Sequence, residues 1–160
     1  MAKSDLKYCY RWPRPGYTAD CVILRPAKKS NFEVLLIQRG NEPFKGSWAL
    51  PGGFVNEYEA LPTAAARELQ EETGLTDVKL KFVDIYGEEG RDPRGWTVSG
   101  VFWGFLPKGQ KPKAGDDAAN FRWFPVDKLP SIAFDHEKII ADAMKKMKRS
   151  TRPANRPSVD

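Results

Sequence analysis

Cysteine and histidine are scarce in this chain of 160 residues, and long apolar runs are missing. The two cysteines, Cys9 and Cys21, are too few for a disulfide framework and lack the spacing of a metal-binding pair. No apolar run approaches the length of a membrane span, and residues 1–12 lack the apolar core of a signal peptide. These absences predict a cytoplasmic protein with no membrane partner.

The remaining composition is that of a globular domain, with 41% hydrophobic and 29% charged residues. A chain of this length suffices for one domain with a sizeable core. We expect the domain to span residues 1–148, including an N-terminal arm over residues 1–16 that is rich in aromatic residues and proline. Residues 149–160 are expected to form a basic, flexible tail.

The formal net charge of +5 raises the question of a nucleic-acid partner. Much of the excess lies in residues 144–157, where no aromatic residue is interleaved with the charges as a single-strand platform would require. A basic end of a chain is ordinarily solvated. We therefore expect no nucleic-acid partner, and a modest positive field would attract an anionic small molecule.

Apolar patterns predict more strands than helices. The expected strands cover residues 18–24, 32–38, 48–50, 54–55, 78–86, 96–106 and 120–126. Helix formers predict a central helix over residues 62–73, and an amphipathic pattern predicts a second helix over residues 136–148. Strands on both sides of a central helix indicate an α+β fold built as a sandwich.

The central helix concentrates charge within six residues, at Arg67, Glu68, Glu71 and Glu72. Helical spacing puts the three glutamates on one side, where their like charges repel one another. Carboxylates are ligands of hard divalent cations, and Mg²⁺ is usually held by a few carboxylates together with water and substrate phosphates. Gly52 and Gly53 precede the helix and permit close approach of the backbone to a ligand. These features predict a divalent metal site.

The same stretch resembles the Nudix box, G-x5-E-x7-R-E-U-x-E-E-x-G-U, in which U is a bulky apolar residue. The matching residues are Gly53, Glu59, Arg67, Glu68, Leu69, Glu71, Glu72, Gly74 and Leu75. An exposed acidic helix is the ordinary alternative, but it would need neither the flanking glycines nor the distant Glu59. The resemblance implies the Nudix fold, an α/β/α sandwich with a mixed central sheet between helices.

Members of this family hydrolyse a nucleoside diphosphate linked to a further group. The resemblance implies that Mg²⁺, or Mn²⁺ in its place, is held by Glu68, Glu71, Glu72 and the carbonyl of Gly52. Arg67 would pair with a carboxylate and keep the glutamates in register, and Glu59 would support an outer metal or an ordered water. Arg67, Glu68 and Glu72 are thus the predicted catalytic residues.

The general base stays open at this point. In some members the first glutamate of the R-E-U-x-E-E run, here Glu68, activates the water, and in others a carboxylate from a later loop does so. The later-loop alternatives are Glu88, Glu89, Asp116 and Asp117. An ordinary loop charge is the simpler interpretation of any single one of these four.

The segments around the box resemble the ADP-ribose pyrophosphatase branch of the family, in particular residues 39–54 and 90–95 with Pro93. Three arginines are expected to bind phosphate or the terminal ribose because a guanidinium matches phosphate oxygens: Arg39, Arg91 and Arg94. An aromatic side chain could stack on adenine, and the candidates are Trp48, Phe44 and Trp96, although core packing is the ordinary role of such residues. His136, the only histidine, is expected to be structural.

The predicted function is Mg²⁺-dependent hydrolysis of ADP-ribose to AMP and ribose 5-phosphate, or of a related nucleoside diphosphate sugar. Within enzymes the alternative is a nucleoside triphosphate pyrophosphohydrolase, whose box would look the same. A nucleotide-sensing domain without catalysis is a second alternative, and RNA 5′-end processing is a third, suggested only by the basic charge. The resemblance and the aromatic arm also suggest a homodimer.

Overall fold

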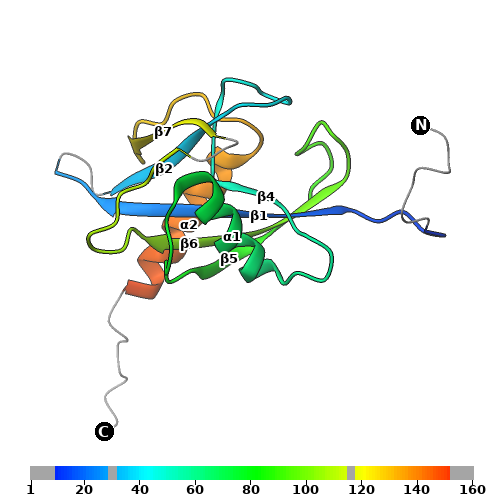
Figure 1. The fold of residues 1–160 in the computed structure, drawn as a ribbon, viewed down its shortest axis with the longest axis horizontal. Coiled ribbons are helices and arrows are strands. Elements are labelled where there is room, and N and C mark those ends of the chain that lie inside the picture. Colours follow the sequence, from blue (N-terminus) through cyan, green and yellow to red (C-terminus); the bar gives the residue numbers. More distant parts are fainter. Residues whose placement is uncertain (1–9, 29–31, 115–117, 152–160) are drawn as a thin grey trace, which may run out of the picture.

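The computed structural model describes residues 10–28, 32–114 and 118–151. Within these ranges (Figure 1) the elements are, in order, β1 (Gly16–Pro26), β2 (Phe32–Arg39), β3 (Trp48–Ala49), β4 (Gly52–Phe54), α1 (Leu61–Thr73), β5 (Lys81–Tyr86), β6 (Thr97–Phe105), β7 (Ala118–Pro125) and α2 (His136–Thr151). Each expected strand and helix is present, and most boundaries agree within two residues. None of the helices in these ranges combines the length and apolar character that crossing a bilayer needs.

Two boundaries differ by three residues from the sequence expectation. Residues 78–80 were expected in a strand, but they form a tight turn in which the Leu80 N–H donates to the Val78 carbonyl at 2.9 Å. The second helix continues past residue 148 to Thr151, and the hydroxyls of Ser150 and Thr151 donate to the Met147 carbonyl at 3.0 and 3.1 Å. Residues 149–151 of the expected tail are therefore helical, and residues 152–160 lie outside the described ranges.

The strands form one mixed sheet. Its order is β3-β2-β1-β6-β5, with β4 paired to β1 and β7 paired to β2. The pair β1–β6 is parallel, from Gly16 opposite Thr97 to Leu24 opposite Phe105, and the other strand pairs are antiparallel. β1 is central and almost continuously buried, as expected for a strand covered on both faces.

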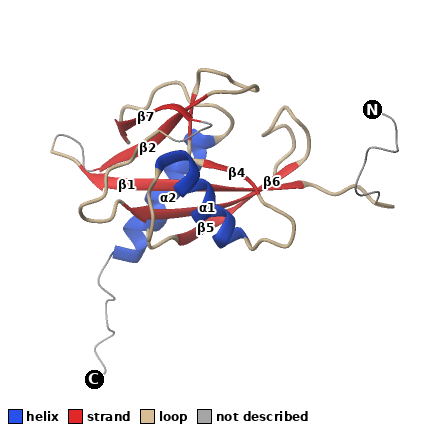
Figure 2. Cartoon of the chain, viewed as in Figure 1, coloured by secondary structure: helices blue, strands red, loops and turns tan. Residues whose placement is uncertain are grey.

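The two helices cover opposite faces of the sheet (Figure 2). Val22 and Leu24 of β1 pack into the core beneath α2. Cys21 and Ile23, which alternate with them, pack into the core beneath α1. This alternation follows from the two-residue period of a strand. The α+β sandwich with a mixed sheet between helices is thereby confirmed.

β4 and α1 bring the box together. β4 runs antiparallel to β1, with Gly53 opposite Ala19 and Gly52 opposite Asp20. α1 then begins with Pro62 in its first turn and ends at Gly74, whose φ of 68° and N–H bond to the Gln70 carbonyl are those of a left-handed cap. Leu69 packs in the core. Glu68 and Glu72 lie on the side of the helix that faces Gly53 and Gly52 of β4.

Candidate active site

Glu72 is the box carboxylate that joins helix α1 to strand β4. Its Oε2 accepts a hydrogen bond from the Gly52 N–H at 2.9 Å. Burial, with the charges of Glu68 and Asp20, raises the pKa of Glu72 to about 8 against the lowering effect of the Gly52 hydrogen bond. Negative charge is thus crowded at this point, and a cation would relieve the crowding.

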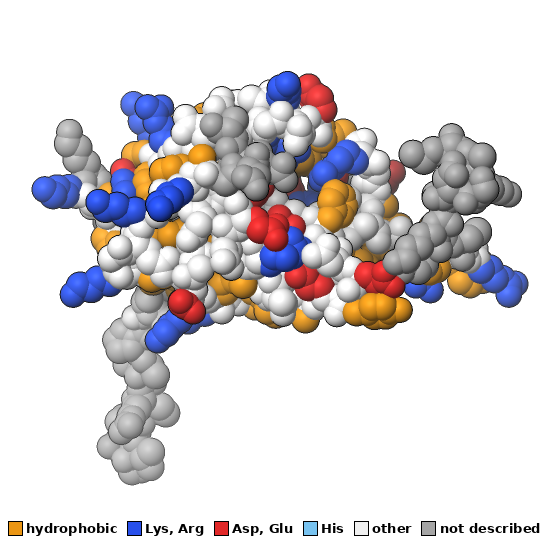
Figure 3. Space-filling model, viewed as in Figure 1, with side chains coloured by type: hydrophobic (Ala, Val, Ile, Leu, Met, Phe, Trp, Pro, Cys, Tyr) orange, Lys and Arg blue, Asp and Glu red, His pale blue; other side chains and the backbone are white. Residues whose placement is uncertain are grey.

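Arg67 ties the other box carboxylates together. Its Nε and Nη2 donate to the two oxygens of Glu59, each at 2.8 Å. Its Nη1 donates to Glu68 at 2.6 Å and to Glu71 at 3.1 Å. Acidic and basic side chains lie side by side on the face that carries α1 (Figure 3). The hydrogen bonds from Arg67 also lower the pKa of Glu59 to about 2, so Glu59 stays ionised and holds the arginine in place.

The donor set fits a hard divalent cation in its chemistry. The Glu68 carboxylate lies against Gly53 so closely that a Cβ there would be 2.5 Å from Glu68 Oε2. A Cβ at Gly52 would collide with the Ala19 carbonyl and Asp20. Among the described residues, no three acidic, histidine or cysteine side chains converge as a ready ligand set. Glu68 and Glu71 are each paired with Arg67.

A small cavity of about 50 Å³ opens beside these glycines. Its lining residues are Thr18, Asp20, Arg39, Leu50, Gly52, Gly53, Phe54, Arg91, Asp92, Arg94, Phe134 and His136. A larger and more open hollow of about 780 Å³ lies beside Arg25 and Lys28, but no box residue lines it. We assign the site to the smaller cavity, since it is lined by box glycines and by the predicted arginines, whereas the larger hollow is not.

The structure brings the three predicted arginines to this one cavity from two separate segments of the chain. Arg39 ends β2, and its Nε donates to the Pro43 carbonyl at 2.7 Å. Burial and the neighbouring charge of Arg94 lower the pKa of Arg39. Arg91 and Arg94 come from the loop between β5 and β6. Two guanidinium groups held near each other in a partly buried site favour an anion between them.

Other predicted residues lie elsewhere. Trp48 is absent from the cavity lining and packs edge-on against Phe124, with ring centroids 4.9 Å apart. Glu88 is exposed and pairs with Lys138 at 3.0 Å. Glu89 is also exposed and away from the lining. Asp116 and Asp117 lie outside the described residues.

Seven lining residues were not singled out from the sequence as functional, and they include Asp20, Asp92, Phe134 and His136. Asp20 had a recognisable signal, because it is a lone carboxylate within an apolar strand, and it accepts a short hydrogen bond from the Ser99 hydroxyl. His136 is buried, and its Nδ1 accepts the Leu50 N–H at 3.0 Å. That contact is structural, as expected, yet it also places the ring at the cavity.

The comparison with known families identifies the class of protein. A family model described as the NUDIX domain matches residues 14–143. The chain therefore belongs to the Nudix family. This match, together with the relatives described next, shows that the protein is a Nudix hydrolase.

The chain is 44% identical over 145 residues to an ADP-ribose pyrophosphatase of Methanocaldococcus jannaschii, which covers 91% of this chain and 82% of the relative. It is 32% identical to the ADPR responsive transcriptional repressor NtrR of Acinetobacter baylyi, which covers 88% of this chain but only 58% of the repressor. The NUDIX domain of Shewanella oneidensis NrtR, solved in complex with ADP ribose, matches with a TM-score of 0.77 and 29% identity, covering 92% of this chain and 99% of that one.

Proposed function

We propose that this chain hydrolyses the pyrophosphate bond of ADP-ribose, or of a closely related nucleoside diphosphate sugar, to a nucleoside monophosphate and a sugar phosphate. The observation that carries the proposal is the arrangement of an acidic helix against one side of β4 and of Arg39 and Arg94 around the adjoining cavity. The similarity to an ADP-ribose pyrophosphatase and to a domain that binds ADP-ribose supports this choice of substrate.

The residues that would hold Mg²⁺, with Mn²⁺ as an alternative ion, are Glu68, Glu71, Glu72 and the carbonyl of Gly52. When bound, the ion would neutralise phosphate charge and lower the pKa of a coordinated water. Gly52 and Gly53 leave room for this because neither position carries a side chain. Arg67, which pairs with Glu59 and Glu68, would keep the glutamates in register.

Glu68 is the general base that the described residues support best. Its carboxylate touches Gly53, which lines the cavity. Burial raises the pKa of Glu68 against the lowering effect of Arg67, so it is a stronger proton acceptor than an exposed glutamate. Glu88, by contrast, is exposed, and the hydrogen bond from Lys138 lowers its pKa.

The diphosphate of the substrate would lie between Arg39 and Arg94. Both arginines use Nε for contacts within the protein, to Pro43 and to Asp92 respectively. Arg94 also uses Nη2 for a hydrogen bond to Asp92. The remaining N–H groups of the two guanidinium groups would donate to phosphate oxygens.

Product analysis with Mg²⁺ tests the function. The purified protein is offered ADP-ribose, a hexose nucleotide and a nucleoside triphosphate in parallel. AMP released fastest from ADP-ribose, with turnover abolished by a chelator, is the expected result. A higher kcat/KM for the triphosphate, with pyrophosphate as product, would reject the proposal in favour of a triphosphate pyrophosphohydrolase.

A ligand-sensing domain is the second function that a specific observation favours, since the chain resembles an ADPR responsive transcriptional repressor and a NUDIX domain solved in complex with ADP ribose. A sensor would bind ADP-ribose with no turnover in Mg²⁺ or Mn²⁺. Calorimetric binding measured beside the product analysis separates the two functions.

We further propose a cytoplasmic homodimer. Three exposed aromatic residues support a second copy at the start of the β1–β6 pair: Trp12, Tyr17 and Trp96, which are 71%, 51% and 56% exposed. Tyr17 is in β1, and the Trp96 carbonyl accepts the Gly16 N–H, so the last two lie close together. Light scattering on the intact chain and on Trp96→Ser tests this, since a monomeric wild-type protein would contradict it.

A further inference from the structure

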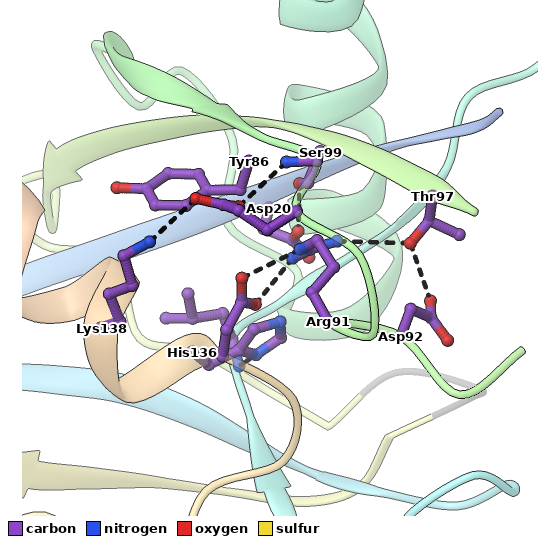
Figure 4. A network of polar contacts seen from close by, with 12 residues as sticks. Asp20, Tyr86, Arg91, Asp92, Thr97, Ser99, His136 and Lys138 are labelled. Atoms are coloured by element: carbon purple, nitrogen blue, oxygen red, sulfur yellow. Dashed lines mark hydrogen bonds and ion pairs between the residues drawn. The ribbon is translucent and has the colours of Figure 1, made fainter. Parts of the chain in front are cut away.

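The loop between β5 and β6, residues 87–96, carries two of the predicted phosphate-binding arginines, Arg91 and Arg94, outside any helix or strand. A side chain on such a loop can bind a substrate well only if other contacts fix its position. Figure 4 shows part of the polar network of this loop, in which Arg91 contacts Thr97 and Thr97 contacts Asp92.

Asp92 holds Arg94 directly. Its Oδ1 accepts the Arg94 backbone N–H at 2.9 Å and Nε at 3.0 Å, and its Oδ2 accepts Nη2 at 2.7 Å. The Asp92 carboxylate is 2% exposed, whereas the Arg94 side chain is 37% exposed. One edge of the guanidinium is thus fixed by a buried carboxylate, while the rest of the group faces the cavity.

Asp92 is itself fixed from behind. The Thr97 hydroxyl donates to Asp92 Oδ2 at 3.2 Å, and Arg91 Nη1 reaches the same hydroxyl at 3.4 Å. Arg91 is 6% exposed, and its Nε and Nη2 donate to the two oxygens of Asp135 at 2.9 and 2.8 Å. This bidentate ion pair links the loop to Asp135, the residue immediately before α2. The Arg91 guanidinium is therefore used for contacts within the protein.

Two aromatic rings also restrict the position of the Arg94 guanidinium. Its guanidinium lies 4.7 Å from the ring centre of Phe54 in β4 and 5.5 Å from that of Phe134. Arg39 lies 4.9 Å from the same Phe134 ring. The two arginines therefore share one aromatic wall, and the position of Arg94 relative to Arg39 depends on both contacts.

We propose that Asp92, and Asp135 acting through Arg91, are positioning residues that hold Arg94 for the diphosphate of the substrate. The inference rests on the proposed function, since it names what Arg94 binds. An arginine that contacts the phosphates equally in the bound substrate and in the transition state affects KM more than kcat. Loss of a group that orients a metal ligand typically costs about tenfold or more in affinity or activity, and we expect an effect at the lower end of that range for a group that orients Arg94.

The test is a double-mutant cycle on the full chain with Mg²⁺ and ADP-ribose, using Asp92→Asn, Arg94→Ala and the double variant. Asparagine keeps the shape and the acceptor for Thr97 but loses the charge that orients Arg94. The expected result is a rise in KM of about tenfold for Asp92→Asn, with kcat nearly unchanged. In the Arg94→Ala background the same substitution should change KM little, because the residue through which it acts is gone.

An equal effect of Asp92→Asn in both backgrounds would overturn the proposal, since a purely structural role does not depend on Arg94. No change in KM in the wild-type background would overturn it as well. Asp135→Asn is the second variant in the same cycle. Asp142→Asn is the matched control, because Asp142 lies in α2 and pairs with Lys145, away from the cavity. Its KM should equal that of the wild type.

Turnover of ADP-ribose by the wild-type protein in the same assay tests the proposed function separately. If the wild type turns over ADP-ribose while Asp92→Asn behaves as the wild type, only the positioning role fails. If the wild type does not turn over ADP-ribose, the proposed function fails first, and the positioning role for that substrate fails with it.

Discussion

At the scale of single residues, Glu72 combines three properties that a solvated glutamate lacks. It is bonded to the Gly52 N–H, its pKa is raised to about 8 by burial, and it lies near the charges of Glu68 and Asp20. We predict that Glu72→Gln folds, because the amide oxygen can still accept the Gly52 N–H. Turnover should fall about 100-fold or more, since even groups that only orient a metal ligand contribute up to about that factor.

The measurement is kcat with saturating Mg²⁺, beside the melting temperature of each protein. Glu137→Gln is the matched control, because it is the same substitution at an exposed position of α2. It should keep wild-type turnover. Activity retained in Glu72→Gln would remove the acidic helix from the mechanism.

At the scale of elements, the end of α1 depends on one backbone conformation. Gly74 has a φ of 68°, and a Cβ there would meet nothing closer than Lys113 Cβ at 4.0 Å. Gly74→Ala should therefore destabilise through the backbone alone, by about 1 kcal/mol, or about 2–4 °C in melting temperature for a chain of this size. Gln70→Ala, at an exposed position of the same helix, should leave the melting temperature nearly unchanged. An unchanged melting temperature in Gly74→Ala would show that the cap contributes nothing.

Elements were predictable from the sequence where burial imposes a pattern, and the site was predictable only where one segment carries it. β1 and β2 are buried on both faces, so their apolar runs marked them clearly. The turn at residues 78–80 was not foreseen, because its alternating residues also suit a strand. Arg91 and Asp135 are 44 residues apart, and nothing local in either segment indicates that they pair. The box could be read from the sequence, whereas the contacts that orient the arginines could not.

At the scale of the whole molecule, His136 links α2 to the segment that leads into β4. Its Nδ1 accepts the Leu50 N–H, so protonation of that nitrogen would break the contact. Burial lowers the pKa of His136, and the charges of Arg91 and Arg39 lower it too, while Asp20 and Asp135 act in the opposite direction. In the unfolded chain the pKa of this histidine has its ordinary value of about 6.5. Below that pH the unfolded state binds more protons, so His136 favours the folded state above pH about 6.5 and loses this contribution as the pH falls toward the lowered pKa.

We predict that His136→Asn removes this part of the pH dependence. The Asn side chain keeps an acceptor for the Leu50 N–H but does not titrate. Between pH about 6.5 and 5 the free energy of unfolding of the wild type should fall relative to the variant, by at most about 1.4 kcal/mol per pH unit for one proton.

The raised pKa of Glu72 changes stability with the opposite sign in the range from about 4.5 to 8. The quantity to measure is therefore the difference in the free energy of unfolding between the two proteins. Urea denaturation in the presence of a chelator gives it directly, with Lys148→Gln, at an exposed position of the same helix, as a substitution that should keep the wild-type slope. Parallel curves for wild type and His136→Asn would mean that the buried histidine does not couple the stability of the molecule to pH.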